Sequence, residues 1–218
     1  MRYYWGQSMG DIATTSVGES KQLLAEEVYH YVGRQIIDGT LAAGERIRDI
    51  DVAEELHVSR TPVREALQRL ERLGMVSMYP SRFTEVTMVT SETIAQSLQF
   101  AGYQAGVAAR LAVPRLTAAQ REHVVKLTAA MHASLDDGSR TSDARWAVFA
   151  YLGDHSGNAQ HRTLMEDASM VLFRNLRDWS VPRSDHRRMR EVYVEFCDAV
   201  LAGDGEGAER LVRKMYYV

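Results

Sequence analysis

The N-terminal part of the chain shows helical stripes of apolar residues, followed by two short runs with strand periodicity. Residues 21–38 carry a stripe that ends before Gly39, formed by Leu24, Val28, Val32 and Ile36. This pattern predicts a first helix with a glycine stop. Residues 49–56 predict a second, short helix, for which Asp49 is a candidate acidic cap. Three residues separate it from a third helix.

The third helix follows Ser59 and combines an apolar face with a basic face. Its apolar positions recur at helical spacing and are expected to face a core: Val63, Ala66, Leu67, Leu70 and Leu73. Arg60 and Arg64 lie four residues apart on the opposite side. The hydroxyl of Ser59 is a candidate cap for the amide of Thr61, and Gly74 ends the helix. Such a helix start is suited to contact phosphates and bases.

A short helix, a tight turn and a longer helix are typical of a helix-turn-helix, whose second helix presents its N-terminus to the major groove. His57 stands in the turn, where histidine tolerates a positive φ better than most residues. Residues 76–79 and 83–88 alternate in polarity around residues 80–82, which predicts a small hairpin, the wing. Residues 19–89 therefore predict a winged helix-turn-helix.

The second half shows helical periodicity broken by short turns, and predicts an all-helical bundle over residues 90–218. The expected helices span residues 91–112, 117–135, 141–154, 160–179, 185–202 and 204–216. Thr117 and Gln120 form a candidate capping box, and Gly203–Gly205 marks a tight break. The fold class is therefore mostly α: an N-terminal winged helix-turn-helix with a small β-hairpin wing, followed by an all-α helical bundle.

Composition narrows the function classes. The chain has 218 residues and 45% hydrophobic content, enough for one large or two modest domains. A net charge of −3 argues against a non-specific nucleic-acid coat, so any basic DNA surface is local. The single cysteine, Cys197, excludes an intrachain disulfide and fits a reducing cytoplasm. No pattern of a membrane span or signal peptide is present, so we expect a soluble, cytoplasmic protein.

Residues 1–18 are rich in Gly, Ser and Thr, yet carry three aromatic residues at positions 3–5. They are interpreted either as a flexible N-terminal tail or as an arm that packs on a partner. The expected organisation is thus a tail over residues 1–18, a DNA-binding domain over residues 19–89 and a helical domain over residues 90–218.

Three motifs give residues 21–89 a family resemblance. They are Asp38 to Gly44 (DGTLAAG), Val58 to Leu67 (VSRTPVREAL), and Leu70-Glu71 followed by Gly74-Met75-Val76. With them the segment resembles the GntR family of bacterial transcription regulators. The resemblance implies a DNA-binding winged helix in which the start of the third helix and the tip of the wing contact DNA.

Carried over by position, the implied DNA contacts are Arg48, Ser59, Arg60, Thr61, Arg64, Ser81 and Arg82. A bidentate arginine–guanine contact contributes roughly 1–3 kcal/mol of discrimination, so Arg60 and Arg64 are expected to read bases. Ser59, Thr61 and Arg48 are expected to fix register through phosphates. The wing departs from the usual glycine-containing tip of the family, which puts a close backbone approach to the minor groove in doubt.

Two patterns in the second half resemble the FCD domain of the FadR-like branch of the same family. They are Leu152 to Asn158 (LGDHSGN) and Ala199 to Asp204 (AVLAGD) followed by Ala208, within a resemblance over residues 95–217. The resemblance implies a helical domain that binds an effector and dimerises.

The FCD pattern usually supplies an aspartate and three histidines as ligands of a divalent metal, and this chain departs from it. The matching positions hold Arg145, Phe149, Tyr193 and Met215. An arginine repels a cation, so neither a metal nor another cofactor is expected. His155, His161 and His186 lie near in sequence, but they lack a recognised ligand spacing and are interpreted as surface or capping residues.

The first helix of this half is crowded with small residues, and Ala101 and Ala105 stand where the metal-binding type carries an arginine and a glutamate. Either the helix packs closely, or loss of side chains widens a pocket. The candidate effector-pocket residues are Ala101, Ala105, Arg145, Phe149, Tyr193 and Met215. Such a pocket suits an anionic or aromatic organic ligand, for example a carboxylate bound to Arg145. Alternatively, Arg145 pairs with a neighbouring acid and the cavity is filled.

These features predict a homodimeric, sequence-specific DNA-binding regulator, a repressor by family tendency, with double-stranded operator DNA and a small organic effector as partners. A regulator with a collapsed pocket that acts constitutively is the alternative. An enzyme would need Asp154, His155 and Ser156 as acid, base and nucleophile, but sequence neighbours rarely converge on one point. A protein-interaction scaffold would leave the arginines of the third helix without a purpose. The chain is therefore expected not to be an enzyme.

Overall fold

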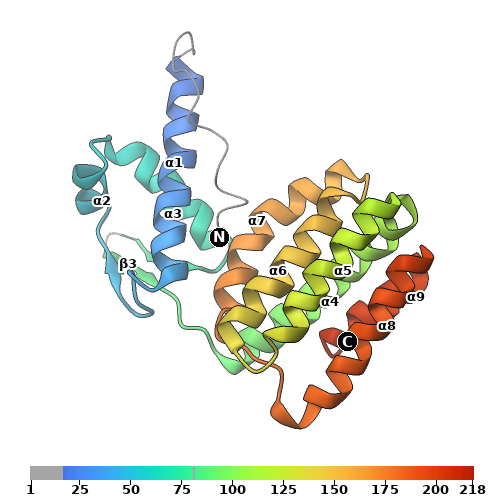
Figure 1. The fold of residues 1–218 in the computed structure, drawn as a ribbon. Helices are drawn as coiled ribbons and strands as arrows, with labels where there is room; N and C mark the ends of the chain where they lie inside the picture. Colours follow the sequence, from blue (N-terminus) through green and yellow to red (C-terminus); the bar gives the residue numbers. More distant parts are fainter. Residues whose placement is uncertain (1–16, 81) are drawn as a thin grey trace. The chain divides into compact units, whose positions relative to one another are not determined.

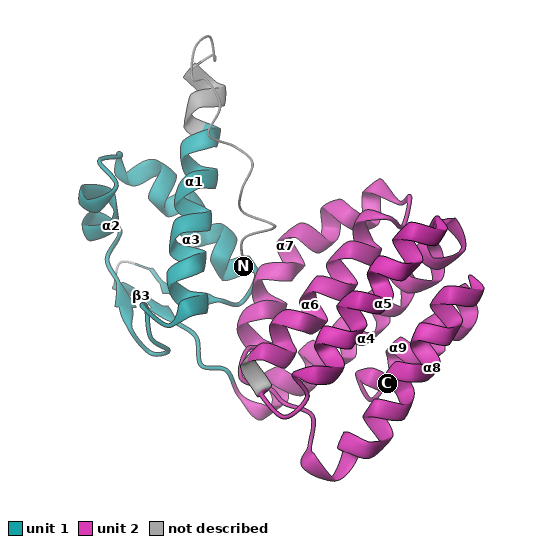
Figure 2. Cartoon of the chain, viewed as in Figure 1, with its two compact units in different colours: residues 1–89 teal, residues 90–218 magenta. Residues whose placement is uncertain are grey.

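The computed structural model describes residues 17–80 and 82–218. The chain forms two compact units, Met1–Val89 and Thr90–Val218 (Figure 2). As predicted, the fold is mostly α-helical, with a small antiparallel sheet in the first unit and helices in the second. Ser81 and most of the N-terminal tail lie outside the described residues, so the expectations for them stay predictions.

The first unit contains α1 (Val17–Asp38), β1 (Arg46–Ile47), α2 (Asp49–Glu55), α3 (Arg60–Arg72), β2 (Val76–Tyr79) and β3 (Phe83–Val86) (Figure 1). Its core lies where α1 packs against α3. The buried side chains include most of the two predicted stripes, namely Val28, Val32, Ile36, Val63, Ala66, Leu67 and Leu70. Leu24 and Leu73, at the ends of these stripes, are only half-buried. Each buried aliphatic side chain of this size contributes about 1.5–3 kcal/mol, which fixes the basic face of α3 toward solvent.

The predicted wing is the antiparallel hairpin of β2 and β3, in which Val76 pairs with Val86 and Tyr79 with Phe83. Among the described residues, β1 adds a further strand on the other side of β3, giving the order β1-β3-β2. The sequence did not predict β1, because a strand of two residues is too short to show alternating polarity.

The turn between α2 and α3 is built around His57, whose φ of 54° confirms the positive φ expected there. The two predicted caps were wrong. Ser59 occupies the N-cap of α3, but within the described residues its hydroxyl makes no capping hydrogen bond. Arg48, not Asp49, takes the N-cap position of α2. The Asp49 carboxylate instead accepts from two guanidinium groups, which bind it more strongly than a backbone amide.

The second unit is a bundle of α4 (Ser91–Ala112), α5 (Ala118–Ala133), α6 (Gly138–Asp154), α7 (Ala159–Leu176), α8 (His186–Ala202) and α9 (Gly205–Met215). Its helix starts are well specified: Thr117 and Gln120 form the predicted capping box of α5, and Asp204 caps α9. Gly203, with a φ of 74°, makes the predicted break before α9. None of the described helices is long and apolar enough to cross a membrane.

Small residues let α4 pack closely against α9 and the turn that follows it. A Cβ on Gly102 would lie 2.6 Å from Val218 Cγ2 and 2.7 Å from Tyr216 Cβ. A Cβ on Gly205 would lie 2.6 Å from the carbonyl oxygen of Arg110. Close helix packing, one of the two interpretations of the small residues in α4, therefore applies at Gly102.

Candidate nucleic-acid interface and effector pocket

The predicted base-reading residues lie at the solvent-exposed start of α3. Arg60 and Arg64 have side chains that are 51% and 59% exposed, and Ser59 and Thr61 beside them are also exposed. The opposite side of the helix is anchored by fully buried Val63. This end of α3 thus exposes two guanidinium groups and two hydroxyls on a helix whose opposite face is buried.

Both arginines share one carboxylate, that of Asp49 at the start of α2. Arg60 Nη2 donates to Asp49 Oδ1 and Oδ2 at 2.9 Å each, and Arg64 Nε donates to Oδ2 at 2.7 Å. Burial raises the pKa of Asp49, but the hydrogen bonds from Arg64 and Arg60 outweigh it and leave the pKa below its ordinary value. This role of Asp49 was not predictable from the sequence, because it depends on a contact across the turn.

Arg48 and the wing flank this pair. Arg48 is 71% exposed and lies 3.4 Å from Asp51, an exposed ion pair that contributes little and leaves the guanidinium accessible. Arg82 near the wing tip is exposed, while Ser81 lies outside the described residues. The guanidinium of Arg46 in β1 lies 4.0 Å from the ring centre of Phe83 in β3.

Two hydrogen bonds join the wing to the end of α3. Glu71 in the last turn of α3 accepts from the backbone amide of Met78 in β2 at 2.8 Å. Thr87, just after β3, donates to the carbonyl oxygen of Gly74 at 2.6 Å. These bonds tie both strands of the hairpin to the end of α3, so helix and wing form one rigid surface.

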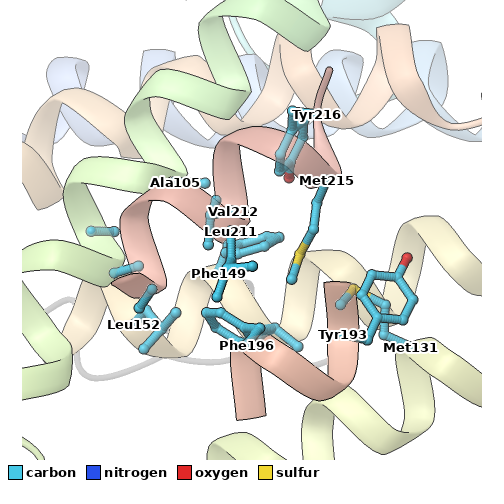
Figure 3. Close-up of a cluster of buried hydrophobic side chains, with 14 of the residues drawn as sticks. Ala105, Met131, Phe149, Leu152, Tyr193, Phe196, Leu211, Val212, Met215 and Tyr216 are labelled. Atoms are coloured by element: carbon cyan, nitrogen blue, oxygen red, sulfur yellow. The ribbon is translucent and has the colours of Figure 1, made fainter. Parts of the chain in front are cut away.

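The candidate effector-pocket residues all lie in the interior of the second unit, contributed by α4, α6, α8 and α9. Each is less than a tenth exposed: Ala101, Ala105, Arg145, Phe149, Tyr193 and Met215. All but the arginine belong to one apolar cluster, most of which Figure 3 shows. The ring centre of Phe149 lies 5.5 Å from that of Tyr216, which packs over the same interior. Residues far apart in the sequence therefore gather in one place.

Arg145 is the charged member of this group and is 5% exposed. Its guanidinium lies 4.5 Å from the ring centre of Trp179 and 5.4 Å from that of Tyr216. Within the described residues neither Nη1 nor Nη2 has a hydrogen-bond partner. The interpretation in which a neighbouring acid pairs with Arg145 through these nitrogens is therefore wrong for the described part of the chain.

Two buried tyrosines lie near Arg145. Burial raises the pKa of Tyr216 to about 12, against the opposing effect of the Arg145 charge. Burial likewise raises the pKa of Tyr193, which Arg145 also opposes. Both phenols remain donors at neutral pH. Trp179 and Tyr216 were missed by sequence reasoning, because they follow the ends of α7 and α9 and belong to no motif.

The residues at the expected metal positions do not fit a divalent metal, since a buried guanidinium stands where a carboxylate ligand is needed. In the described residues no three His, Cys, Asp or Glu side chains come together as a metal-binding group. Two of the three histidines have other partners: His155 Nδ1 lies 2.8 Å from the carbonyl oxygen of Tyr151, and His186 Nδ1 lies 2.8 Å from Asp136 Oδ1. His186 is buried, so its interpretation as a surface residue was wrong. Neither ring nitrogen of His161 has a hydrogen-bond partner within the described residues. The absence of a metal stays a prediction.

The alternative catalytic arrangement at residues 154–156 also lacks support. The ring of His155 is turned toward the backbone of Tyr151, and the hydroxyl of Ser156 accepts from the amide of Asn158 at 3.2 Å. A base and a nucleophile must face each other for acyl transfer. These side chains serve the turn between α6 and α7 instead.

Comparison with known families gives two matches that follow the two units. Residues 24–86 match the family "Bacterial regulatory proteins, gntR family", and residues 106–217 match the "FCD domain". The HTH-type transcriptional regulator LutR of Bacillus subtilis (strain 168) is 28% identical over 196 residues, covering 80% of this chain and 89% of that protein. The "Probable D-xylose utilization operon transcriptional repressor" of Paenarthrobacter nicotinovorans is 29% identical over 98 residues, 45% of this chain and 43% of its own.

Solved structures show the same fold. McbR/YncC of E. coli superposes with a TM-score of 0.65 at 22% identity, covering 89% of this chain and 93% of its own. A GntR transcriptional regulator from Rhodococcus sp. RHA1 gives a TM-score of 0.60 at 23% identity over 88% of this chain and 93% of its own. At such identities the likeness concerns the fold, and residue roles rest on the contacts described above.

Proposed function

Because the chain belongs to the GntR family of bacterial transcription regulators and carries an FCD domain, we propose that it reads operator DNA with its winged helix under control of an organic effector. The family and the matched relatives are transcription regulators and not enzymes, as the sequence predicted. The chain is accordingly a transcriptional regulator of the GntR/FCD type.

The observation that carries the DNA-reading proposal is the exposed arginine pair of α3 on a helix whose other face is fully buried. Arg60 and Arg64 read base edges in the major groove, where an arginine binds guanine O6 and N7. Ser59, Thr61 and Arg48 bind phosphates, which fixes the register without sequence information. Ser81 and Arg82 bring the wing to the neighbouring backbone.

The proposal includes a homodimer in the cytoplasm. Two winged helices of a dimer read the two halves of a pseudo-palindromic operator, because protein and site then share one twofold symmetry. Repression is the proposed output, supported by the name of the Paenarthrobacter relative, which describes a transcriptional repressor. The effector favours one spacing of the two winged helices and shifts operator affinity only by its differential affinity for the two states.

The proposed effector is a small organic anion bound to Arg145 without a metal. Burying an unpaired charge costs several kcal/mol, so an interior guanidinium whose terminal nitrogens lack acceptors favours a carboxylate ligand. Trp179 and Tyr216 supply aromatic faces beside it, and protonated Tyr193 is a further donor. A planar or aromatic monocarboxylate suits this combination of one cation and apolar walls.

A constitutive regulator with a filled interior is the second candidate. It is favoured by the packing of Phe149 against Tyr216 and by the deep burial of Met215, which leave the apolar cluster well packed. The two candidates differ in one measurable property, because the constitutive protein binds its operator equally well with and without organic anions.

Mobility shifts with duplex DNA from upstream of the chain's own gene test the DNA-reading proposal. A discrete complex that survives excess unrelated duplex and weakens steeply with salt is expected. A matched duplex with the same composition in shuffled order is the control. Equal affinity for both duplexes would rule out a sequence-specific regulator of this promoter, and selection from a random duplex library would extend that result to other sites.

A further inference from the structure

We propose that Asp49 is a specificity-determining positioning residue, which holds Arg60 and Arg64 in a fixed, DNA-ready arrangement and suppresses their binding to phosphates of unrelated sequence. This inference rests on the proposed DNA-reading role of the two arginines. None of the motifs in the sequence assigns a function to Asp49.

The geometry supports a rigid three-residue unit. One carboxylate receives three hydrogen bonds of 2.7–2.9 Å from the two guanidinium groups, although Asp49 precedes Arg60 by 11 residues and Arg64 by 15. The Asp49 side chain is 21% exposed, so it is largely enclosed while both arginines reach solvent. A long, flexible side chain loses much entropy when it is fixed, and here that loss has occurred before DNA binds.

The pattern of donors determines what the arginines can still bind. Arg64 uses Nε for Asp49, so its Nη1 and Nη2 form an open edge, the two-donor edge that matches O6 and N7 of a guanine. Arg60 uses Nη2 and retains Nη1 and Nε. Asp49 therefore sets which edge of each guanidinium points outward, and with it the spacing of the two donor sets.

The negative charge of Asp49 weakens non-specific binding to DNA phosphates. Its carboxylate neutralises part of two adjacent cations and repels any phosphate that approaches them. A base edge accepts hydrogen bonds without a full negative charge, so it suffers less from this repulsion. Asp49 thus lowers the affinity for phosphates more than the affinity for bases, which raises the ratio of specific to non-specific binding.

The test uses the full chain and its Asp49→Asn, Asp49→Glu and Glu54→Gln variants. Selection from a random duplex library with the wild-type chain gives a consensus duplex, and a shuffled duplex of the same composition is the non-specific probe. Asp49→Asn is expected to lower the ratio of the two affinities about tenfold, the effect of one disturbed arginine–guanine contact. The salt dependence on the shuffled duplex should steepen by up to about 0.9 in log–log slope for each phosphate gained.

The matched variants distinguish an effect of the position of Asp49 from an effect of its charge and from an effect on folding. Glu54→Gln makes the same acid-to-amide change at an exposed site of α2 and should leave the ratio unchanged. Asp49→Glu retains the charge and should restore most of the ratio. A wild-type ratio in Asp49→Asn would overturn the inference. So would a parallel loss of both affinities with a lower melting temperature, since that marks a purely structural role. A wild-type chain that selects no consensus would instead overturn the DNA-reading proposal itself.

Discussion

The two units treat arginine in opposite ways. On α3, two exposed arginines share the carboxylate of Asp49, so their charge is partly neutralised and their position set before any ligand arrives. Inside the helical unit, Arg145 is buried with two terminal nitrogens that lack acceptors among the described residues. The proposed role of the surface pair is to discriminate between ligands, whereas the proposed role of the buried arginine is to bind one ligand that supplies the missing acceptors.

The largest expected effect comes from removing both surface arginines. Arg60→Ala combined with Arg64→Ala should reduce operator discrimination by about 2–6 kcal/mol, twice the contribution of one arginine–guanine contact. The melting temperature should stay unchanged, because neither side chain belongs to the core. Mobility shifts on the consensus and shuffled duplexes measure the effect. An intact sequence preference would show that α3 is not the reading helix.

Replacing the buried Arg145 should produce a gain, in protein stability, where removing the surface pair produces a loss. Arg145→Met should stabilise the ligand-free protein by about 1–4 kcal/mol, as seen when buried charges are replaced by apolar residues of similar volume. Sodium benzoate is expected to raise the melting temperature of the wild type, since ligands stabilise only the form that binds them, and Arg145→Met should abolish this rise. Thermal unfolding with and without benzoate, acetate or phosphate measures both.

Arg140→Met is the matched control, because Arg140 lies on the same helix and is exposed. It should leave the melting temperature and the benzoate effect nearly unchanged. If Arg145→Met destabilises the protein and no carboxylate shifts the wild type, the constitutive regulator with a filled interior is the better description.

A substitution in the core of the helical unit tests the packing around Arg145. Gly102→Ala puts a methyl group within 2.7 Å of Val218 and Tyr216, and overpacking of this kind destabilises by about 1–3 kcal/mol. Because Tyr216 lies beside Arg145, the benzoate effect should change as well. Chemical unfolding of the full chain measures the stability, with Gly153→Ala, at a site with no neighbour within 4 Å, as control.

A smaller effect is expected at Arg48, for which we propose a phosphate contact rather than a base contact. Arg48→Ala should weaken the consensus and shuffled duplexes by similar factors and lower the log–log salt slope by about 0.9 for the one phosphate lost. Titrations at several salt concentrations measure the slope. A selective loss of consensus binding would move Arg48 into the group of base readers.

The smallest effect is expected from metal removal. Because Arg145 occupies a position where a ligand carboxylate is needed, treatment with a chelator should change neither the melting temperature nor operator binding. Elemental analysis of the purified protein should find no stoichiometric zinc, nickel or manganese. One equivalent of such a metal per chain would contradict the assignment of the buried arginine as an anion receptor.

The sequence predicted the elements well because their signals are local. Stripes such as Val28 and Val32, the capping residues of α5 and the glycine before α9 act within a few residues, and the turn at His57 has its expected φ. Contacts between elements were not predictable in the same way. The role of Asp49 depends on how two helices meet, and the lack of partners at Arg145 depends on every neighbour at once. Family resemblance located Arg145 but not its contacts, and it did not single out Asp49.

The hydrogen bond from Met78 to Glu71 has a consequence for the operator itself. Since the hairpin is tied to the last turn of α3, the bases that we propose the helix reads and the backbone that we propose the wing contacts should be separated by a set distance. An inserted base pair would displace one from the other by about 3.4 Å along the duplex. The half-site should therefore have a fixed length. Base substitutions between the helix contact and the wing contact should be tolerated, whereas an inserted base pair should not.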